Sequence, residues 1–491
     1  MAEIIGAETE TRGKLKAIAS GTLSNGDTVV VNSDGTVSKV AGITGGLGSE
    51  TTFESAGVYY ASASNGFDSN SNRFVIAYYD AGNSGYGTAV VAEVSGTSVT
   101  FGTPVVFSTG SVVIDGPNPI AFDSTNNKIV IAYRDNGIAS AVERGQAIVG
   151  TINPSDNSIS FGTAAPFGGN GTECCLCFDS SNDKIVLSFR NGSNSGYGTA
   201  AVGTISGTSI SFGTLVVYRS ATCVYNANAY DTNAGKVGIF YRDIANSGYG
   251  YGIVGTVSGT SISFGSASAI QTAGTDGISC TYDSTAQKIL VTFQNSNTNN
   301  YGQIRTATIS GTSFSYGTEA LFNAGNTGHI RCAYNATANN TVVVYRDNSN
   351  SGYGTYNTVT VSGTDCTVGT EVVINTSATT YTTVAHGANS SATLIAYVDG
   401  DGGLDYGKAR VLAEDSTNIT AENFIGISST TVADTETATI DIIGTTNNAQ
   451  SGLTAGQKYY VQNDGTLSTT ADDPSVLAGT ALSATKIVVK T

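Results

Sequence analysis

The sequence repeats one pattern of apolar and polar residues along most of its length. In each copy an apolar run ends at an aspartate or asparagine, a polar turn follows, and a second apolar run comes next. The residues that end the first run lie 55, 56, 52, 52, 52 and 52 positions apart. So regular a period indicates one array of seven related repeats and not seven independent domains. We call these residues the anchors: Asp80, Asp135, Asn191, Asp243, Asn295, Asp347 and Asp399.

The composition favours β-strands. The chain has 491 residues, including 61 Gly and 25 Tyr, but only one Met and no Trp. Charged residues make up 12%, and Ser, Thr and Asn supply much of the remainder. Turn-forming residues are therefore plentiful and long helix-forming side chains are scarce. This balance predicts an all-β fold of strands joined by tight turns.

The repeat that contains Asp135 shows how four strands fill one unit. Strand A ends at Phe122, strand B spans 128–134, strand C spans 145–152, and strand D begins at Ser158. Strand B is apolar on both of its alternating faces, which predicts burial on both sides. Blades packed between neighbouring blades meet that condition, and Kelch-type propeller repeats are close to this length, at about 50 residues. We therefore expect a seven-bladed β-propeller with four-stranded blades, at 48–412.

The seventh repeat lacks its fourth strand. After strand C, at 406–412, the chain turns polar and the Ser-Gly-Thr element of the other repeats is missing. Near the N-terminus, 49–57 resembles the passage from strand D to strand A in an ordinary repeat, at 322–328. We expect 51–55 to supply the outer strand of the last blade, which would close the ring and remove an open sheet edge.

The two ends of the chain carry related hairpin patterns, at 23–38 and 453–468. Each places Asp-Gly-Thr directly after an apolar strand and two polar residues, and Asp-Gly in this setting predicts a tight β-hairpin. Further candidate strands lie at 424–427, 437–443 and 486–489. The matching patterns predict one small β-module, assembled from 1–47 and 413–491, with the propeller inserted between its halves.

The charge and the N-terminus exclude several classes of partner. The formal net charge of −16 argues against a surface that binds nucleic acid. The N-terminal residues are acidic, and no run of roughly 18 apolar residues occurs, so we expect neither a signal peptide nor membrane insertion. The cysteine count is odd, which favours buried, reduced thiols over a disulfide framework or a metal site. The seven are Cys174, Cys175, Cys177, Cys223, Cys280, Cys332 and Cys366.

Catalytic and metal-binding patterns are weak. The only two histidines, His329 and His386, fall at different places in their repeats, so nothing supports a Ser-His-Asp site and a structural role is expected. We predict no catalytic residues, no cofactor and no metal; calcium would need about six clustered oxygen ligands. The aspartates between strands A and B are expected to stabilise turns by accepting backbone hydrogen bonds. They are Asp68, Asp123, Asp179, Asp231 and Asp283.

Tyrosines recur at the turn between strands B and C. In six of the seven repeats a tyrosine precedes a glycine at the start of strand C, on the face where variable D–A connections also emerge. They are candidates for stacking against a glycan, although each ring can instead pack over its own turn. The candidates are Tyr86, Tyr197, Tyr249, Tyr301, Tyr353 and Tyr406. Four arginines that close strand B are expected to pair with an adjacent aspartate or a neighbouring blade: Arg134, Arg190, Arg242 and Arg346.

The C-terminal pattern GLTAGQKYYVQNDGTLSTT, followed by AGTALSATKIVVK, resembles a module of tailed-bacteriophage structural proteins, particularly tail fibres and other virion-surface proteins. The repeats, with FDS, YRD, NSGYG and SGTS, are similar to those of large marine-phage proteins. The resemblance implies a non-enzymatic virion component made in the host cytoplasm, with no catalytic residues to transfer. The terminal module would dock to other virion proteins, and the propeller would display a surface for host or glycan attachment.

A second hypothesis places a lectin or a glycan-processing enzyme on the same scaffold. A cluster of non-repeating carboxylates at one mouth of the ring would favour an enzyme, because an active site breaks the symmetry of the repeats. A homo-oligomer is compatible with the sequence, which does not fix the receptor or the part of the virion.

Overall fold

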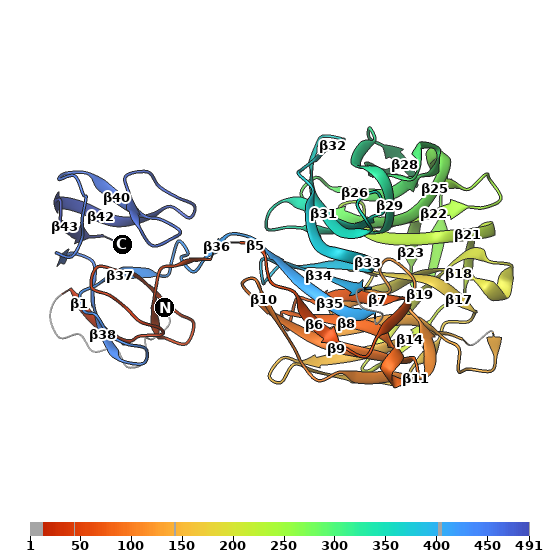
Figure 1. The fold of residues 1–491 in the computed structure, drawn as a ribbon, viewed down its shortest axis with the longest axis horizontal. Coiled ribbons are helices and arrows are strands. Elements are labelled where there is room, and N and C mark those ends of the chain that lie inside the picture. The colour runs from red at the N-terminus through yellow and green to blue at the C-terminus, as the bar shows by residue number, and fades with distance from the viewer. Residues whose placement is uncertain (1–12, 44, 142–143, 401–404, 491) are drawn as a thin grey trace. The chain divides into compact units, whose positions relative to one another are not determined.

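The computed structural model describes residues 13–43, 45–141, 144–400 and 405–490, and this part of the chain is all-β, without an α-helix. The chain divides into two compact domains (Figure 1). Met1–Gly45 and Asp415–Thr491 form the terminal domain, and Gly46–Glu414 form the repeat domain. No helix among the described residues is long and apolar enough to cross a membrane.

Strand B of every repeat is eight residues long and ends at its anchor. Its residues are buried in an unbroken run; in β8, Phe74 to Tyr78 are all buried. The predicted burial of both faces is therefore confirmed. These strands are β8 (Arg73–Asp80), β13 (Lys128–Asp135), β18 (Lys184–Asn191), β22 (Lys236–Asp243), β26 (Lys288–Asn295), β30 (Asn340–Asp347) and β34 (Ala392–Asp399).

Strand C follows each strand B antiparallel, and in six repeats a short strand then folds back through the Ser-Gly-Thr turn or its Asn-rich variant. The C strands are β9 (Tyr86–Ser95), β14 (Gly145–Asn153), β19 (Tyr197–Ser206), β23 (Tyr249–Ser258), β27 (Tyr301–Ser310), β31 (Tyr353–Ser362) and β35 (Tyr406–Ala413). The short strands are β10 (Ser98–Phe101), β15 (Ser158–Phe161), β20 (Ser209–Phe212), β24 (Ser261–Phe264), β28 (Ser313–Tyr316) and β32 (Asp365–Val368).

The D–A connections differ from the variable loops expected from the sequence. In four repeats the connection is one continuous strand that serves two repeats: the first part of β21 pairs with β19, and its last part pairs with β22. These strands are β21 (Val216–Asp231), β25 (Ser268–Asp283), β29 (Ala320–Asn335) and β33 (Val372–Gly387). In the first three repeats the same path is divided among β7 (Val58–Asp68), β11 (Val105–Val113), β12 (Ile120–Asp123), β16 (Ala165–Pro166) and β17 (Gly171–Asp179).

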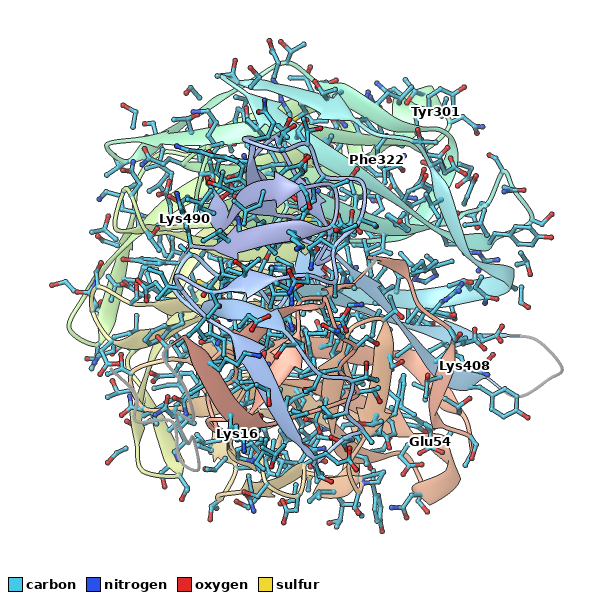
Figure 2. The ribbon with its side chains drawn as sticks, turned by 90° about the vertical axis from the view of Figure 1, so that its left-hand side faces the viewer. Lys16, Glu54, Tyr301, Phe322, Lys408 and Lys490 are labelled. Carbon is cyan, nitrogen blue, oxygen red and sulfur yellow. The ribbon has the colours of Figure 1, made fainter. Side chains whose placement is uncertain are left out.

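Two strands from the N-terminal side lie beside strand C of the last repeat. β5 (Gly46–Leu47) and β6 (Thr51–Glu54) both pair antiparallel with β35; Lys408 of β35 and Glu54 of β6 are labelled in Figure 2. Side chains reinforce the pairing, because Glu50 accepts a hydrogen bond from the Tyr397 hydroxyl at 2.5 Å and forms an ion pair with Lys408 at 2.9 Å. β6 thus occupies the place beside β35 that the first part of β21 occupies beside β19.

Neighbouring repeats meet through one recurrent backbone contact. A Cβ added to Gly213, just after β20, would lie 1.9 Å from the backbone oxygen of Thr260 in the next repeat. Only glycine fits so close an approach between two backbones. The same approach joins Gly102 to Asn157, Gly162 to Thr208, Gly265 to Thr312, Gly317 to Thr364, and Gly48 to Thr97.

The terminal domain holds two five-stranded sheets around a shared apolar core, in which Val30 and Ile427 of one sheet contact Val461 and Ile487 of the other. The first sheet contains β1 (Lys14–Ile18), β38 (Thr437–Asp441), β37 (Phe424–Ser428), β2 (Thr28–Val31) and β3 (Val37–Lys39). The second contains β39 (Thr446–Asn447), β43 (Lys486–Val489), β42 (Val476–Ser483), β40 (Lys458–Val461) and β41 (Leu467–Ser468). Both predicted hairpins are present, as β2–β3 and β40–β41.

The two hairpins close in the same way. The Asp34 carboxylate accepts hydrogen bonds from the backbone amide and the hydroxyl of Thr36, at 2.9 and 2.6 Å. Asp464 accepts the equivalent pair from Thr466, at 2.8 and 2.6 Å. The intervening glycines, Gly35 and Gly465, have φ of 83° and 84°, a conformation that few other residues adopt readily. The Asp-Gly-Thr motif therefore forms the same turn at both ends of the chain.

Candidate functional site

The inner strands of five repeats carry a β-bulge at the same place. In β21, for example, pairing with β22 is interrupted between Val224 and Ala227, and Tyr225 in the gap has φ of 56°. A positive φ is uncommon outside glycine, and a bulge redirects the side chain of the extra residue. The five residues at these bulges, each 18 positions before its anchor, are Glu173, Tyr225, Gly277, His329 and Tyr381.

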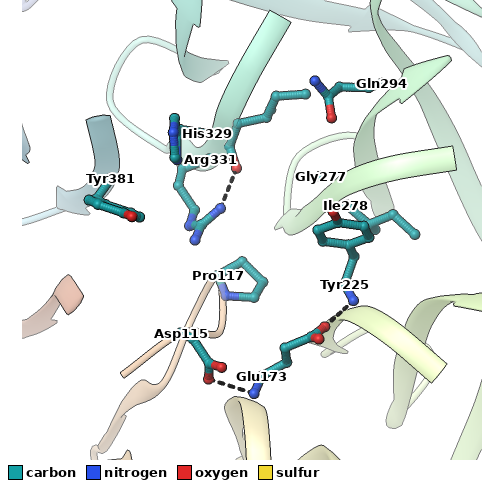
Figure 3. Close-up of a pocket in the computed structure, with 11 residues that line it drawn as sticks. Asp115, Pro117, Glu173, Tyr225, Gly277, Ile278, Gln294, His329, Arg331 and Tyr381 are labelled. Atoms are coloured by element: carbon teal, nitrogen blue, oxygen red, sulfur yellow. Dashed lines mark hydrogen bonds between the residues drawn. The ribbon is translucent and has the colours of Figure 1, made fainter. Parts of the chain in front are cut away.

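All five bulge residues line one cavity of about 340 Å³ (Figure 3). Pro117, which is 18 positions before Asp135, lines it too. Six repeats therefore contribute equivalent backbone positions to the cavity, and these positions hold five different residue types, since only tyrosine occurs twice. We call this cavity the mouth pocket; its other lining residues are Asp115, Ile278, Gln294, Ile330 and Arg331. A second cavity of about 440 Å³ shares Asp115 and Tyr381 with it and also contacts Tyr79 and Arg134.

Two carboxylates link three consecutive repeats at the pocket. The Asp115 carboxylate accepts a hydrogen bond from the backbone amide of Glu173 at 2.5 Å, and the Glu173 carboxylate accepts one from the backbone amide of Tyr225 (Figure 3). Burial raises the pKa of Glu173 to about 7, and the charge of Asp115 adds to this effect. Burial also raises the pKa of Asp115. Glu173 is therefore a carboxyl group that exchanges its proton near neutral pH.

A single guanidinium group, that of Arg331, projects into the same pocket (Figure 3). Its Nη1 donates to the carbonyl oxygen of Ile330 at 2.8 Å. Burial lowers the pKa of Arg331, but a guanidinium stays charged in proteins. Among the residues the structure describes, this charge has no ion-pair partner.

His329 is neutral at physiological pH. Burial, together with the charges of Arg331 and Arg346, lowers its pKa to about 4. Its ring meets the ring of Tyr381 edge to face, with centroids 4.9 Å apart. The residues that line the pocket include no serine or cysteine, so the pocket lining itself holds no nucleophile for a Ser-His-Asp arrangement. His386 also has a pKa lowered to about 4 by burial, and its Nδ1 lies 3.2 Å from the Thr393 hydroxyl.

Four arginines act on the ionisable groups of the pocket. The charges of Arg134 and Arg331 act to lower the pKa of Asp115. The charge of Arg190 acts to lower the pKa of Glu173, and that of Arg346 acts to lower the pKa of His329. The expected pairing of strand-B arginines holds for Arg242, which pairs with Asp276 of the next repeat. It does not hold for the other three within the described residues: Arg134 Nε donates to the Asn136 side chain, and the buried Nε atoms of Arg190 and Arg346 have no partner. Of the residues that line the pocket, Arg331 is the one cation, while Arg134, Arg190 and Arg346 act on the lining groups from outside it.

The six tyrosines predicted as ligand-binding residues lie elsewhere. Each is the first residue of its C strand and pairs with its anchor across the B–C turn, as Tyr301 does with Asn295. The six side chains are partly exposed, and none of them lines the mouth pocket. The Lys408 ammonium group lies 5.7 Å from the centre of the Tyr406 ring. The structure therefore leaves glycan stacking by these rings as a hypothesis and brings a different group of residues together.

Sequence reasoning missed the mouth pocket, although one pattern pointed to it. The position 18 residues before each anchor changes chemical type from repeat to repeat, while the residues around strand B stay nearly constant. Variation in the D–A connections is visible in the sequence, but there it predicts variable loops and not a site. Variation at one aligned position of a regular array is what a shared binding site would produce.

The other predicted residues have structural roles. Asp231 accepts hydrogen bonds from the backbone amides of Asn233 and Ala234, both at 2.9 Å, and the other A–B aspartates do the same in their turns. Their predicted turn role is confirmed. All seven cysteines are free thiols, and all but Cys366 are buried. Within the described ranges no group of three His, Cys, Asp or Glu residues is placed to hold a metal ion.

Comparison with known proteins yields structural likeness only. No family model matches the chain, and no curated protein matches it. Solved structures similar to it include the BP39L lectin from Burkholderia pseudomallei, with TM-score 0.52, 10% identity, and coverage of 74% of this chain and 98% of the lectin. The Myceliophteria thermophila Cps50 (Swd1) β-propeller domain has TM-score 0.45, 8% identity and coverage of 74% and 99%. The polysaccharide lyase Uly1 has TM-score 0.45, 9% identity and coverage of 81% and 99%. The likeness to the lectin concerns the fold alone.

Proposed function

We propose that this protein is a non-enzymatic attachment component of a tailed-phage virion. In this proposal the repeat domain is a closed seven-bladed β-propeller that binds a host-surface glycan, and the terminal domain docks to other proteins of the particle. The observation that carries the binding role is the mouth pocket, where six repeats place five different residue types on equivalent backbone positions.

Three observations support a closed ring. The inner strands contact one another in chain order from β7 to β33, and β33 also contacts β7. One apolar cluster joins the first repeat to the last, through Phe74 and Ile76 of β8 and Leu394 and Ala396 of β34. The approach of Gly48 to Thr97 repeats, between the last and the first repeat, the contact that Gly213 makes with Thr260. An open stack would leave both end repeats with an uncovered apolar face.

The shape and lining of the mouth pocket suit a sugar. Its volume of about 340 Å³ falls within the usual range of ligand pockets, roughly 300–1,000 Å³. The Tyr225 side chain is 40% exposed at the pocket, so an apolar ring face is available beside the polar groups of Gln294 and Glu173. Sugars are bound by this combination, because their C–H faces stack on aromatic rings while their hydroxyls form hydrogen bonds.

The contacts of the two carboxylates favour binding over catalysis. Asp115 and Glu173 each accept a backbone amide hydrogen bond from the next bulge, so both stabilise the bulged backbone that forms the pocket. A general acid would instead direct its proton, and a general base a free lone pair, at the reacting atoms of the substrate.

A glycan-processing enzyme is the second candidate, and one observation favours it. Asp115 and Glu173 do not recur: the position of Asp115 is occupied by Gly171, Cys223 and Thr275 in the next three repeats. Non-repeating carboxylates at one pocket are the feature expected of an active site on a propeller. Product analysis of oligosaccharides incubated with the purified protein decides between the two candidates, since the binding proposal predicts unchanged chain lengths.

The terminal domain supports the docking role in two ways. It has its own apolar core of residues from both chain ends, so it can serve as a separate attachment module. Its C-terminal sequence also resembles a module of phage structural proteins. Labelled antibody against the repeat domain, imaged on intact particles, tests this role: the proposal requires label at the particle surface, and label confined to free protein would contradict it.

The glycan-binding role is tested with two tyrosine variants. Binding of the full-length protein to an oligosaccharide panel is measured for the wild type, for Tyr225→Ala and for Tyr301→Ala. We expect Tyr225→Ala to lose binding because it removes the exposed ring of the mouth pocket, and Tyr301→Ala to retain it. The reverse result would move the site to the tyrosines at the B–C turns, and a wild-type protein that binds no glycan would contradict the proposed function.

A further inference from the structure

We propose that the mouth pocket selects an anionic saccharide and that Arg331 binds its carboxylate or sulfate group. This inference rests on the proposed glycan-binding function and specifies its ligand. It follows from three features of the described residues: an unpaired guanidinium directed into the pocket, further arginines that act on its ionisable groups, and an acidic remainder of the chain.

The guanidinium of Arg331 has no role in the scaffold that the other repeats share. The position 16 residues before the anchor, which Arg331 occupies, holds Cys175, Ala227, Ser279 and Thr383 in four other repeats. Those repeats form the same bulge without an arginine. The backbone therefore does not require a cation at this position.

A partly buried charge without a counter-ion is unfavourable. Arg331 is half-buried, its hydrogen bond is to the carbonyl of the preceding residue, and no described carboxylate lies within ion-pair distance. Removing a charge from water without pairing it raises the free energy of the folded protein. An anionic ligand group supplies the missing partner, and a guanidinium binds a carboxylate or sulfate through two parallel hydrogen bonds.

The surrounding charges strengthen this preference. Four guanidinium groups, those of Arg134, Arg190, Arg331 and Arg346, act on the ionisable groups of the pocket, against the carboxylates Asp115 and Glu173. The nearby aspartates Asp243 and Asp276 are paired with Arg219 and Arg242. On a chain of net charge −16, Arg331 is the one cation among the lining residues with which an anionic ligand group can pair.

The rest of the lining fits the same ligand. Glu173 lies across the pocket from Arg331 (Figure 3), and when it carries a proton it can donate a hydrogen bond to an anionic oxygen. His329, held neutral, adds no charge of either sign, which leaves Arg331 as the cation of the lining. A neutral sugar would leave the Arg331 charge both unpaired and further desolvated. A polynucleotide, which is anionic as well, is disfavoured because its many phosphates would meet the acidic surface outside the pocket.

The test measures affinity of the full-length protein by isothermal titration calorimetry for three probes. The first is trigalacturonate, the second is the same trisaccharide with its carboxyl groups reduced to alcohols, and the third is that neutral trisaccharide carrying a sulfate ester. We expect Arg331→Gln to raise the Kd for the anionic probes by about tenfold or more, the loss expected for a hydrogen bond to a charged group. Its affinity for the neutral probe should stay unchanged. The two anionic probes show whether carboxylate or sulfate is preferred.

Two further variants make the result specific. Arg331→Lys keeps the charge but loses the two-pronged geometry, so its Kd should fall between those of the wild type and Arg331→Gln. Arg73→Gln is the matched control, because Arg73 begins β8 at the end away from the anchor, pairs with Glu93 and lines neither the mouth pocket nor the adjoining cavity. Its affinities should equal those of the wild type.

Each outcome separates the inference from the function on which it rests. Equal affinity for neutral and anionic probes, or anionic binding that Arg331→Gln leaves intact, would overturn the assignment of Arg331 while glycan binding stands. Absence of binding to all three probes, in a protein that also binds nothing on the wider oligosaccharide panel, would overturn both.

Discussion

The closed-ring proposal makes a quantitative prediction at Gly48. This residue precedes β6, the strand from the N-terminal side, and a Cβ there would lie 1.8 Å from the backbone oxygen of Thr97 in the first repeat. An ordinary contact between these atoms is more than 1 Å longer, and both partners belong to backbone that cannot rotate away. Gly48→Ala must therefore separate the first and last repeats locally.

The expected loss of stability can be compared with that of an equivalent glycine contact between two internal repeats. Overpacking by one methyl group in a well-packed interior destabilises a protein by typically about 1–3 kcal/mol. Gly213→Ala meets the backbone oxygen of Thr260 at 1.9 Å, so it creates the same clash between two internal repeats. If the ring is closed by the N-terminal strand, the two substitutions should destabilise the repeat domain equally. In a domain that spans Gly46–Glu414 such a loss lowers Tm by roughly 1–4 °C.

Differential scanning calorimetry of the full-length protein measures the effect. The transition that moves in Gly213→Ala belongs to the repeat domain, and Gly48→Ala should lower the same transition by a similar amount. Ser49→Ala, at an exposed neighbouring residue, is the control and should leave it unchanged. If Gly48→Ala behaves like Ser49→Ala while Gly213→Ala destabilises, the N-terminal segment does not close the ring and the reasoning is wrong.

Three further predictions follow from the described contacts. The pKa of Glu173 is raised to about 7 in the folded protein, so between the ordinary glutamate pKa and this value the folded state binds more protons than the unfolded state. The free energy of unfolding should therefore fall as pH rises through 5–7, and thermal melts of Glu173→Gln should show a shallower fall. Identical pH slopes for the wild type and the variant would contradict the raised pKa. Asp231→Ala should lower the free energy of unfolding of the repeat domain by about 1–2 kcal/mol, measured by urea unfolding, because it leaves two turn amides without their acceptor. A loss near zero would show that the carboxylate does not stabilise the turn. Burial raises the pKa of the thiols, including that of Cys366 to about 11, so a thiol reagent at pH 8 should react slowly with the native protein. After denaturation it should react with all seven cysteines, and fewer than seven reactive thiols would indicate a disulfide.

The strands were predictable because local patterns determine them. Strand B is apolar on both faces in every repeat, and in the structure its last residue is the anchor each time. The Asp-Gly-Thr hairpins followed from turn chemistry, since Asp34 and Asp464 accept the hydrogen bonds that the motif implies. The pairing of β6 with β35 could be expected from a missing strand in one repeat and an unassigned one near the other end.

The mouth pocket could not be predicted in the same way. Its residues are directed by bulges with positive φ, yet the bulged positions hold Glu173, Tyr225, His329 and Tyr381, and of these residue types only histidine is enriched in this conformation. The register shift arises where a strand leaves one repeat and joins the next, so it depends on tertiary packing and not on local propensity. Side chains more than 200 positions apart, such as Asp115 and Arg331, meet only as a result.

The bulges also explain why one array can hold a site without losing its stability. Backbone at positive φ outside glycine costs about 1–3 kcal/mol per residue, and four bulge residues here bear that strain. The strain persists because each bulge lies between the well-paired ends of a long inner strand, and because Asp115 and Glu173 bond the next bulge amide. Strain that serves no purpose would be relieved by glycine, which occupies the position in only one bulge, at Gly277. Under the proposed binding role, the larger side chains at the other bulges are the groups presented to the ligand.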